Sequence, residues 1–123
     1  MLVLAIFVTA CSATPKIVDN GNPGQIKEVV FLDENRNNVM DQSEPGVVDQ
    51  VGISQDISYP AGNKDKVTII ETNAAGETVY KDRKPGIYCV AYMGSKGVTT
   101  KLTVEVYLSS EQEARVDFGL PAE

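Results

Sequence analysis

The chain has 123 residues, a formal net charge of -6 and no histidine. This length suits one domain with one core, and a composition of 42% hydrophobic and 23% charged residues is typical of a globular protein. The acidic balance and the scattered Lys and Arg residues argue against a nucleic-acid partner, because such proteins gather basic residues on one face. Without histidine the commonest general base is missing, so we do not expect an enzyme.

The chain begins with MLVLAIFVTACSATP, a short apolar run followed by small residues and a cysteine. This run is too short to span a membrane as a helix. Val8-Thr9-Ala10-Cys11 resembles the lipobox of bacterial lipoproteins. The resemblance implies a signal peptide over residues 1–10, a lipid on Cys11 that anchors the protein to a membrane, and a location in the bacterial cell envelope outside the cytoplasm. An ordinary cleaved secretory peptide or an N-terminal strand are the alternatives.

The next segment contains Pro, Gly, Asn and small polar residues, which predicts a flexible linker over residues 11–24. The folded domain is expected over residues 25–123. Cys89, within GIYCVAY, should behave as a small buried hydrophobic residue. If Cys11 carries a lipid, Cys89 has no partner for a disulfide within the chain.

The domain contains short segments rich in β-branched and aromatic residues, separated by turn residues, and no sustained helical period. Apolar and polar residues alternate from Lys101 to Leu108 and from Ala114 to Leu120, which predicts strands buried on one face. The segment SSEQE between them is expected as a hairpin loop, with a helical turn as the alternative. The pattern predicts an all-β fold, an immunoglobulin-like or prealbumin-like antiparallel β-sandwich of about seven strands. The expected strands are IKEVVFL, DQVGISQ, KVTIIET, ETVYK, GIYCVAY, KLTVEVYL and ARVDFGL.

Between the first two predicted strands, FLDENRNNVMDQSEPG places oxygen-bearing side chains at the intervals of an EF-hand calcium loop. Calcium prefers six to eight oxygen ligands, and a loop that coils around the ion presents alternate residues to it. The sixth position, usually glycine, is Asn38, which tolerates the left-handed backbone that a sharp turn needs. A polar surface loop and a magnesium site are the alternatives. The candidate ligands are the side chains of Asp33, Asn35, Asn37, Asp41 and Glu44 and the backbone carbonyl of Val39.

The run VVFLDENRNNVMDQSEPGVVDQVGI resembles the SdrD B-like repeats of serine-aspartate-repeat adhesins, within the Cna-B and prealbumin-like superfamily. Downstream, ETNAAGETVYKDRKPGIYCVAY and VDFGL are similar to later motifs of that family. The resemblance implies the same calcium ligands and a rigid, non-catalytic extracellular module used as a stalk or spacer. Some Cna-B relatives join a first-strand lysine to a last-strand Asn or Asp. Here Lys27 shares strand parity with Val29 and Phe31, which would point it inward. Asp117 has the opposite parity to Val116 and Phe118 and should face outward, so we expect no such bond.

Two functions follow from these observations. The first is a calcium-stabilised spacer module of a lipid-anchored lipoprotein. The alternative is an adhesion-type module that recognises an extracellular carbohydrate or protein through its loops. Tyr59, Tyr80 and Tyr107 are the aromatic residues that would serve the alternative, although packing in the core is the simpler role for each. The sequence does not determine the oligomeric state.

Overall fold

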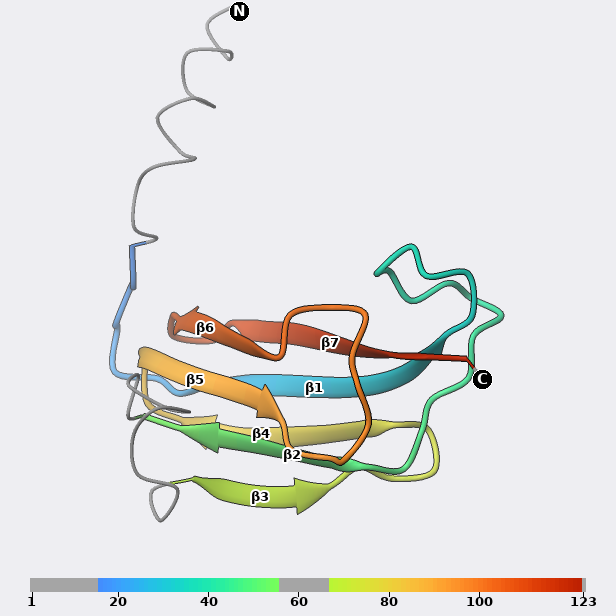
Figure 1. Cartoon of the computed structure of the whole chain (residues 1–123). Coiled ribbons are helices and arrows are strands. Elements are labelled where there is room, and N and C mark those ends of the chain that lie inside the picture. Colours follow the sequence, from blue (N-terminus) through green and yellow to red (C-terminus); the bar gives the residue numbers. More distant parts are fainter. Residues whose placement is uncertain (1–15, 56–66, 123) are drawn as a thin grey trace, which may run out of the picture.

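The computed structural model describes residues 16–55 and 67–122 of the chain, and these residues form strands without helices. No segment within these two ranges is a helix long and apolar enough to cross a membrane. Each of the segments expected from the sequence overlaps one strand, and β1, β4 and β7 extend beyond the expected bounds (Figure 1). The strands are β1 (Gly24–Asp33), β2 (Gln50–Ser54), β3 (Thr68–Glu71), β4 (Glu77–Arg83), β5 (Gly86–Tyr92), β6 (Thr103–Leu108) and β7 (Glu113–Pro121).

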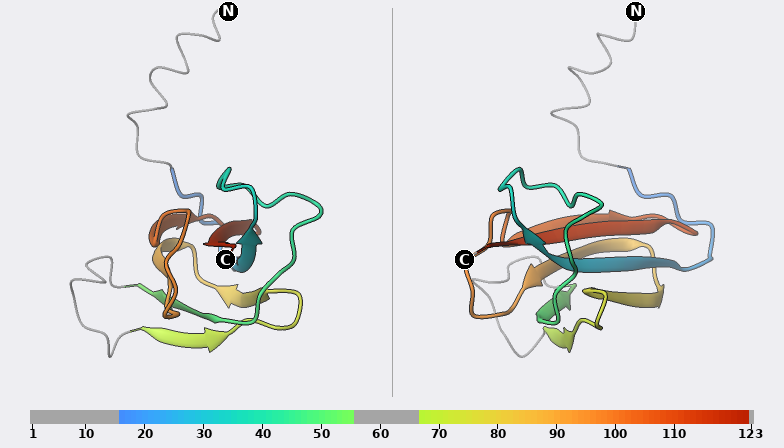
Figure 2. Two further views of the ribbon diagram at one scale, coloured as in Figure 1. Left: turned by 45° about the vertical axis from the view of Figure 1, so that its right-hand side comes forward. Right: turned by 90° about the vertical axis from the view of Figure 1, so that its right-hand side faces the viewer.

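The strands form two sheets, one with the order β4-β1-β7 and the other with the order β3-β2-β5-β6. All neighbouring strands are antiparallel except β1 and β7, which are parallel. Two views of the ribbon show the sheets facing each other (Figure 2). The predicted all-β sandwich is therefore confirmed. The segment from Ser109 to Gln112 is not the hairpin loop expected from the sequence, because β6 and β7 belong to different sheets and the segment crosses between them.

The core lies between the two sheets and follows the alternation read from the sequence. In β7, Val116, Phe118 and Leu120 are at most 8% exposed. In β6 the alternation holds for Val106 and Leu108, whereas Leu102 precedes the strand and is 50% exposed. The buried core residues are Ile26, Val30, Val51, Ile53, Tyr80, Tyr88, Val90, Tyr92, Val106, Leu108, Val116, Phe118 and Leu120.

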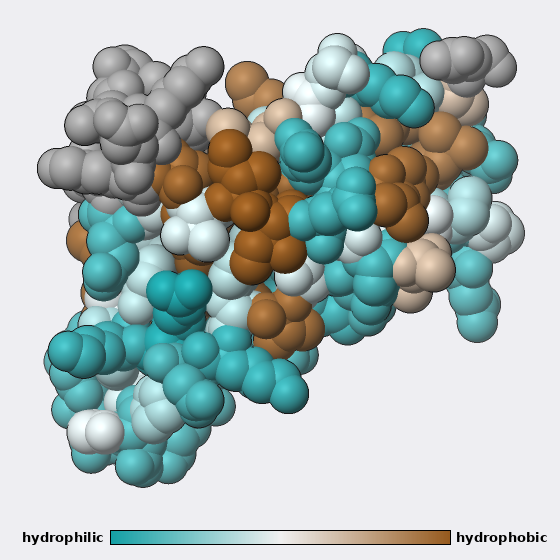
Figure 3. Space-filling model, turned by 90° about the horizontal axis from the view of Figure 1, so that it is seen from below, coloured by the Kyte–Doolittle hydropathy of each residue, from teal (hydrophilic) through white to brown (hydrophobic). Residues whose placement is uncertain are grey.

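One edge of the four-stranded sheet remains apolar. β3 is the edge strand at the bottom of Figure 1, and its Ile69 and Ile70 are 50% and 37% exposed. Figure 3 views the molecule from that side and shows hydrophobic side chains grouped among polar ones. Cys89 is buried on the outer face of the same sheet, beside Ala91, as expected for a small hydrophobic residue.

The chain enters and leaves the sandwich at opposite ends (Figure 1). At the entry end, the segment before β1 is held against the connection between β6 and β7. Ser110 N–H donates to the Val18 carbonyl at 2.8 Å, and Glu111 N–H donates to the Pro23 carbonyl at 3.0 Å. The predicted lipid site, Cys11, lies outside the described residues.

Candidate metal centre

The predicted calcium loop leaves the sandwich at the end of β1 and returns to it beside the same strand. Leu32 N–H donates to the Pro45 carbonyl at 2.9 Å, and Val47 N–H donates to the Val30 carbonyl at 2.8 Å. Gly46 packs so closely that an added Cβ would lie 1.9 Å from the Ala75 carbonyl oxygen. The Pro-Gly pair after Glu44 therefore closes the base of the loop, and only glycine fits at its second position.

Asp33, the first candidate ligand, is fully buried at the end of β1. Its Oδ1 accepts a hydrogen bond from Asn37 N–H at 3.2 Å, and its Oδ2 accepts hydrogen bonds from Asn38 N–H at 2.9 Å and from the Thr99 hydroxyl at 2.6 Å. Burial opposes ionisation of this carboxyl, but the hydrogen bonds from Thr99 and from loop N–H groups outweigh it and lower the pKa of Asp33. The group is therefore a carboxylate at neutral pH.

Thr99 and Gly119 support Asp33, and neither residue belongs to the loop motif. Thr99 lies on the connection between β5 and β6, and its N–H donates to the Gly119 carbonyl of β7 at 2.8 Å. A Cβ on Gly119 would lie 2.6 Å from Thr99 Oγ1 and 3.1 Å from Asp33 Cβ. Because Gly119 has no side chain, the Thr99 hydroxyl has room to hydrogen-bond to Asp33. Only contacts between distant segments reveal this role, so the local spacing carried no signal for it.

The middle of the loop is a series of tight turns stabilised by asparagine side chains. Asn35 Oδ1 accepts a hydrogen bond from Asn37 N–H at 3.2 Å, and Asn37 Oδ1 accepts one from Val39 N–H at 3.1 Å. Asn38 has a φ of 67°, which confirms the left-handed conformation expected at the sixth position. Arg36 also has a positive φ, of 56°, which the sequence analysis did not predict.

Asp41 and Glu44 complete the loop. Asp41 Oδ2 accepts hydrogen bonds from the side-chain amides of Asn35 at 2.6 Å and Asn37 at 3.4 Å. Glu44 is 5% exposed, and its two oxygens accept hydrogen bonds from Glu34 N–H at 2.7 Å and Asp41 N–H at 2.8 Å. The five candidate side chains are thus linked by one hydrogen-bond network, whereas the Val39 side chain is 60% exposed.

The candidate side chains have the chemistry of a site for a hard cation, because three carboxyl groups and two amides all offer oxygen atoms, as calcium prefers. Their placement is less complete, since in the described ranges no three His, Cys, Asp or Glu side chains lie close enough together to hold a metal ion. The oxygens instead accept hydrogen bonds from N–H groups of the loop. Two amide N–H groups now converge on one oxygen of Asp41. Asp41 therefore has hydrogen-bond partners within the loop itself.

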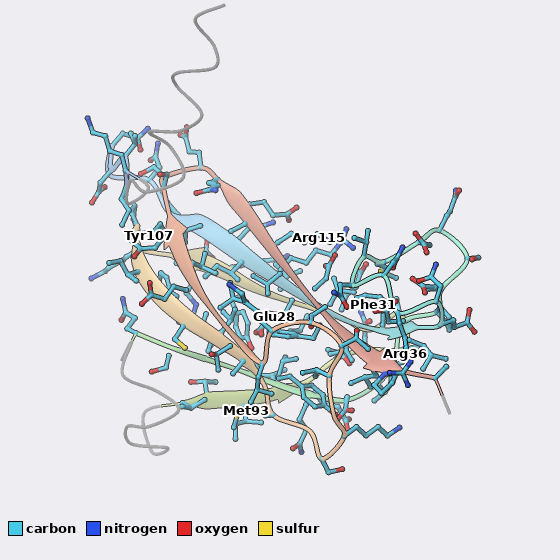
Figure 4. The ribbon with its side chains drawn as sticks, turned by 45° about the horizontal axis from the view of Figure 1, so that its top comes forward. Glu28, Phe31, Arg36, Met93, Tyr107 and Arg115 are labelled. Atoms are coloured by element: carbon cyan, nitrogen blue, oxygen red, sulfur yellow. The ribbon has the colours of Figure 1, made fainter. Side chains whose placement is uncertain are left out.

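Several other residues singled out in the sequence lie apart from the loop. Lys27 pairs with Glu77 at 3.2 Å, and Asp117 pairs with Arg115 at 2.7 Å. The outward orientation expected for Asp117 is therefore confirmed, whereas the inward orientation expected for Lys27 is wrong, and both residues are engaged with other partners. Arg115 also faces the loop, since its Nη2 lies 3.6 Å from Met40 Sδ (Figure 4).

The candidate binding tyrosines have different environments. Tyr80 is 3% exposed in the core, and Tyr107 donates to Glu105 at 3.0 Å. Tyr59 lies outside the described residues. A hollow of about 480 Å³ lies beside the loop, and it is the surface on which an adhesion-type module would bind a ligand. It is lined by Asn38, Thr99, Thr100, Lys101, Val104 and Asp117.

A scan against protein-family models and a search of curated proteins both found no match. Solved structures do match. SpaD, a major pilin of Corynebacterium diphtheriae, has a TM-score of 0.56 at 13% identity and covers 87% of this chain. The pilus 2b backbone protein of group B streptococcus has a TM-score of 0.52 at 12% identity over 81% of this chain. The TIE protein of Bacillus anthracis has a TM-score of 0.54 at 11% identity over 81% of this chain.

These matches establish a likeness of fold. The aligned parts make up 34%, 42% and 16% of the respective chains, so each known protein is much longer than this one. The sandwich is therefore a fold that occurs within bacterial pilus proteins. This agrees with the β-sandwich predicted from the sequence.

Proposed function

We propose that this chain is a non-enzymatic structural module of a bacterial cell-surface lipoprotein, an SdrD B-like domain stabilised by calcium. The observation that carries the proposal is the parallel pairing of β1 with β7, from Gln25↔Glu113 to Asp33↔Pro121. Because the chain enters at the start of β1 and leaves at the end of β7, this ladder joins entry to exit. A pull along the chain would load its hydrogen bonds together, which suits a spacer.

Calcium bound in the loop would further stabilise the sandwich at the end where the chain leaves β7. Asp33, Asn35, Asn37, Asp41 and Glu44 would supply side-chain oxygens, with the Val39 carbonyl as a further ligand. The three carboxylates outweigh the charge of the ion, and the two amides add oxygens without further repulsion. Asp33 pairs with Pro121 in the ladder, so an ion held there would brace the ends of β1 and β7. The ion contributes charge neutralisation and folding free energy, and no catalytic step.

The lipobox-like sequence supports a lipid anchor on Cys11, and the likeness to pilus proteins supports a place on the cell surface. The anchor would precede the entry end of the sandwich, whereas the calcium loop lies at the exit end (Figure 1). The module would therefore hold its loop, and whatever follows Glu123 in a longer protein, away from the membrane.

Calorimetric melting with calcium and then with a chelator tests the metal site. We expect calcium to raise the melting midpoint, because a ligand at a hundredfold excess over its dissociation constant stabilises a fold by about 2.7 kcal/mol. The variants Asp33→Ala and Glu44→Ala should lose this rise, whereas Glu105→Ala, an exposed carboxylate on β6, should keep it. If calcium does not change the melting midpoint of the unmodified protein, the metal site is refuted and the segment is a polar surface loop.

The adhesion-type alternative rests on the hollow beside the loop. Its lining combines Lys101 and Asp117 with threonine hydroxyls, which suits a polar ligand such as a carbohydrate or a polar protein segment. A glycan array probed with the domain, with Lys101→Ala as the comparison, separates this alternative from a spacer. Binding that the substitution removes would favour adhesion.

A further inference from the structure

The core contains a carboxyl group that neither the calcium loop nor the spacer role uses. Ile26, Glu28 and Val30 lie on the inner face of β1, and all three are 0% exposed. Figure 4 shows Glu28 in the middle of the molecule, with strands around it. Neither of its carboxyl oxygens has a hydrogen-bond partner among the described residues. An unpaired carboxylate in such a place is costly, because burial removes its hydration without replacement.

A second buried polar group lies next to it on the adjacent strand. In the ladder between β1 and β4, Ile26 pairs with Tyr80 and Glu28 pairs with Thr78, so Tyr80 occupies the next inner-face position. The Tyr80 hydroxyl is also buried and without a hydrogen-bond partner in the described ranges. It is near enough to affect the pKa of Glu28, although the two groups do not meet the geometry of a hydrogen bond.

Among the described residues around Glu28, the positive group is that of Arg83 on β4, which lies over the Tyr80 ring at 5.4 Å from its centroid and forms no ion pair with Glu28. From β5, the Tyr88 hydroxyl donates to the Lys84 carbonyl at 2.6 Å, and the Tyr92 hydroxyl donates to Asp49 at 2.8 Å. The inner-face residues of β2, β6 and β7 are apolar, namely Val51, Ile53, Val106, Leu108, Val116, Phe118 and Leu120.

We propose that Glu28 is a proton-dependent latch of the sandwich: the neutral carboxyl lets the two sheets close over it, and loss of its proton loosens their packing around β1. The neutral carboxyl group loses little hydration when the sheets close over it, whereas the carboxylate would draw water between the sheets, because the one hydroxyl beside it, that of Tyr80, does not replace its hydration shell. The latch acts through β1, the strand that also carries the calcium loop and the ladder to β7.

The pH dependence follows from burial. Burial raises the pKa of Glu28 from 4.5 to about 8, and Tyr80 lowers it by a smaller amount. A raised folded-state pKa gives stability that is complete below the unfolded value and is lost as pH rises through the folded value. The unfolding equilibrium constant should therefore rise about tenfold per pH unit between 4.5 and about 8, and then level off.

Urea unfolding of the chain between pH 5 and pH 9, in the presence of chelator, tests the latch. The unmodified protein should show the tenfold rise per unit, and Glu28→Gln should remove it, because glutamine does not titrate. Glu77→Gln is the matched control, since Glu77 lies on β4 beside β1 but pairs with Lys27 on the outer face. An unchanged pH dependence in Glu28→Gln would overturn the proposal.

A measurement on the unmodified protein keeps the test independent of how well that variant folds. Carbon-detected NMR of the carboxyl groups should show one glutamate that remains protonated at pH 6.5. Tyr80→Phe should move its titration to higher pH, because Tyr80 now favours the ionised form. If every glutamate titrates near the ordinary value of 4.5, Glu28 is hydrated and the latch does not exist.

Discussion

Thr99 and Asp33 are 66 residues apart in the sequence and share a hydrogen bond of 2.6 Å. Thr99 N–H also bonds to the carbonyl of Gly119, which lies beside Phe31 in the ladder between β7 and β1. The candidate calcium loop is thus hydrogen-bonded to the connection between β5 and β6 as well as to its own strand. Asp33 therefore joins β1 of one sheet to the connection between two strands of the other sheet.

Thr99→Val should weaken calcium binding. The substitution keeps the shape of the side chain but removes the hydroxyl that orients Asp33 and stabilises its charge. Loss of such a supporting residue typically costs tenfold to a hundredfold in metal affinity, so we expect the calcium dissociation constant to rise by roughly tenfold or more. Isothermal titration calorimetry measures it. Thr103→Val, on the outer face of β6, is the control, and equal affinities in both variants would contradict the supporting role.

Gly119→Ala should destabilise the fold. An added Cβ would lie 2.6 Å from Thr99 Oγ1 and 2.9 Å from Phe31 Cζ, so the loop or the ring has to move. Overpacking of this kind typically costs about 1–3 kcal/mol, and urea unfolding measures it. Gly86→Ala provides a matched control, because a Cβ there meets no atom within 4 Å. Equal stability of the two variants would show that Thr99 does not depend on the space at Gly119.

Acidification should lower the free energy of unfolding through protonation of Asp33. The folded-state pKa of Asp33 is lowered from 3.8, so its stabilising contribution is complete above the unfolded value and is lost as pH falls through the folded one. In chelator, urea unfolding between pH 2 and pH 5 should show the unmodified protein losing stability below about pH 3.8. Asp33→Asn should flatten this loss. A variant that follows the unmodified curve would show that other carboxyls dominate.

The strands were predictable because period-two alternation and turn residues report directly on half-buried strands. The candidate ligands were chosen for a similar reason, since a coil around a cation imposes fixed spacing within one short segment, and their binding of calcium stays a prediction. Asn38 illustrates this, because its left-handed backbone was expected from its position alone. Local patterns therefore located both the sheets and the candidate ligands.

What the sequence did not reveal depends on contacts between distant segments. Thr99 and Gly119 reach Asp33 only when β7 lies beside β1, and no local pattern encodes that neighbour. The same holds for the crossing at Ser109, which was expected as a hairpin because it separates two consecutive strands. Glu28 reads as a polar residue in an apolar run, and only its inner-face position shows that it is buried.

Cys11→Ser tests the lipid anchor. If signal peptidase cuts before Cys11 and a lipid is attached, the unmodified protein should partition into detergent and incorporate labelled palmitate in a bacterial host. The serine variant should do neither, because a hydroxyl does not replace the thiol in lipid transfer. Cys89→Ser is the control, since Cys89 is buried within the folded domain. Release of the unmodified protein without label would support the ordinary secretory peptide instead.

The direction of pulling should determine how strongly the sandwich resists force. A pull between Gly24 and Pro121 shears the ladder between β1 and β7, because these residues lie at opposite ends of the parallel pair. A pull between Gln25 and Glu113, which face each other in that ladder, opens it one pair at a time. Single-molecule pulling through paired cysteines at these positions should give a several-fold higher unfolding force for the first geometry. Equal forces would mean that the ladder bears little of the load and would remove the main support for a spacer.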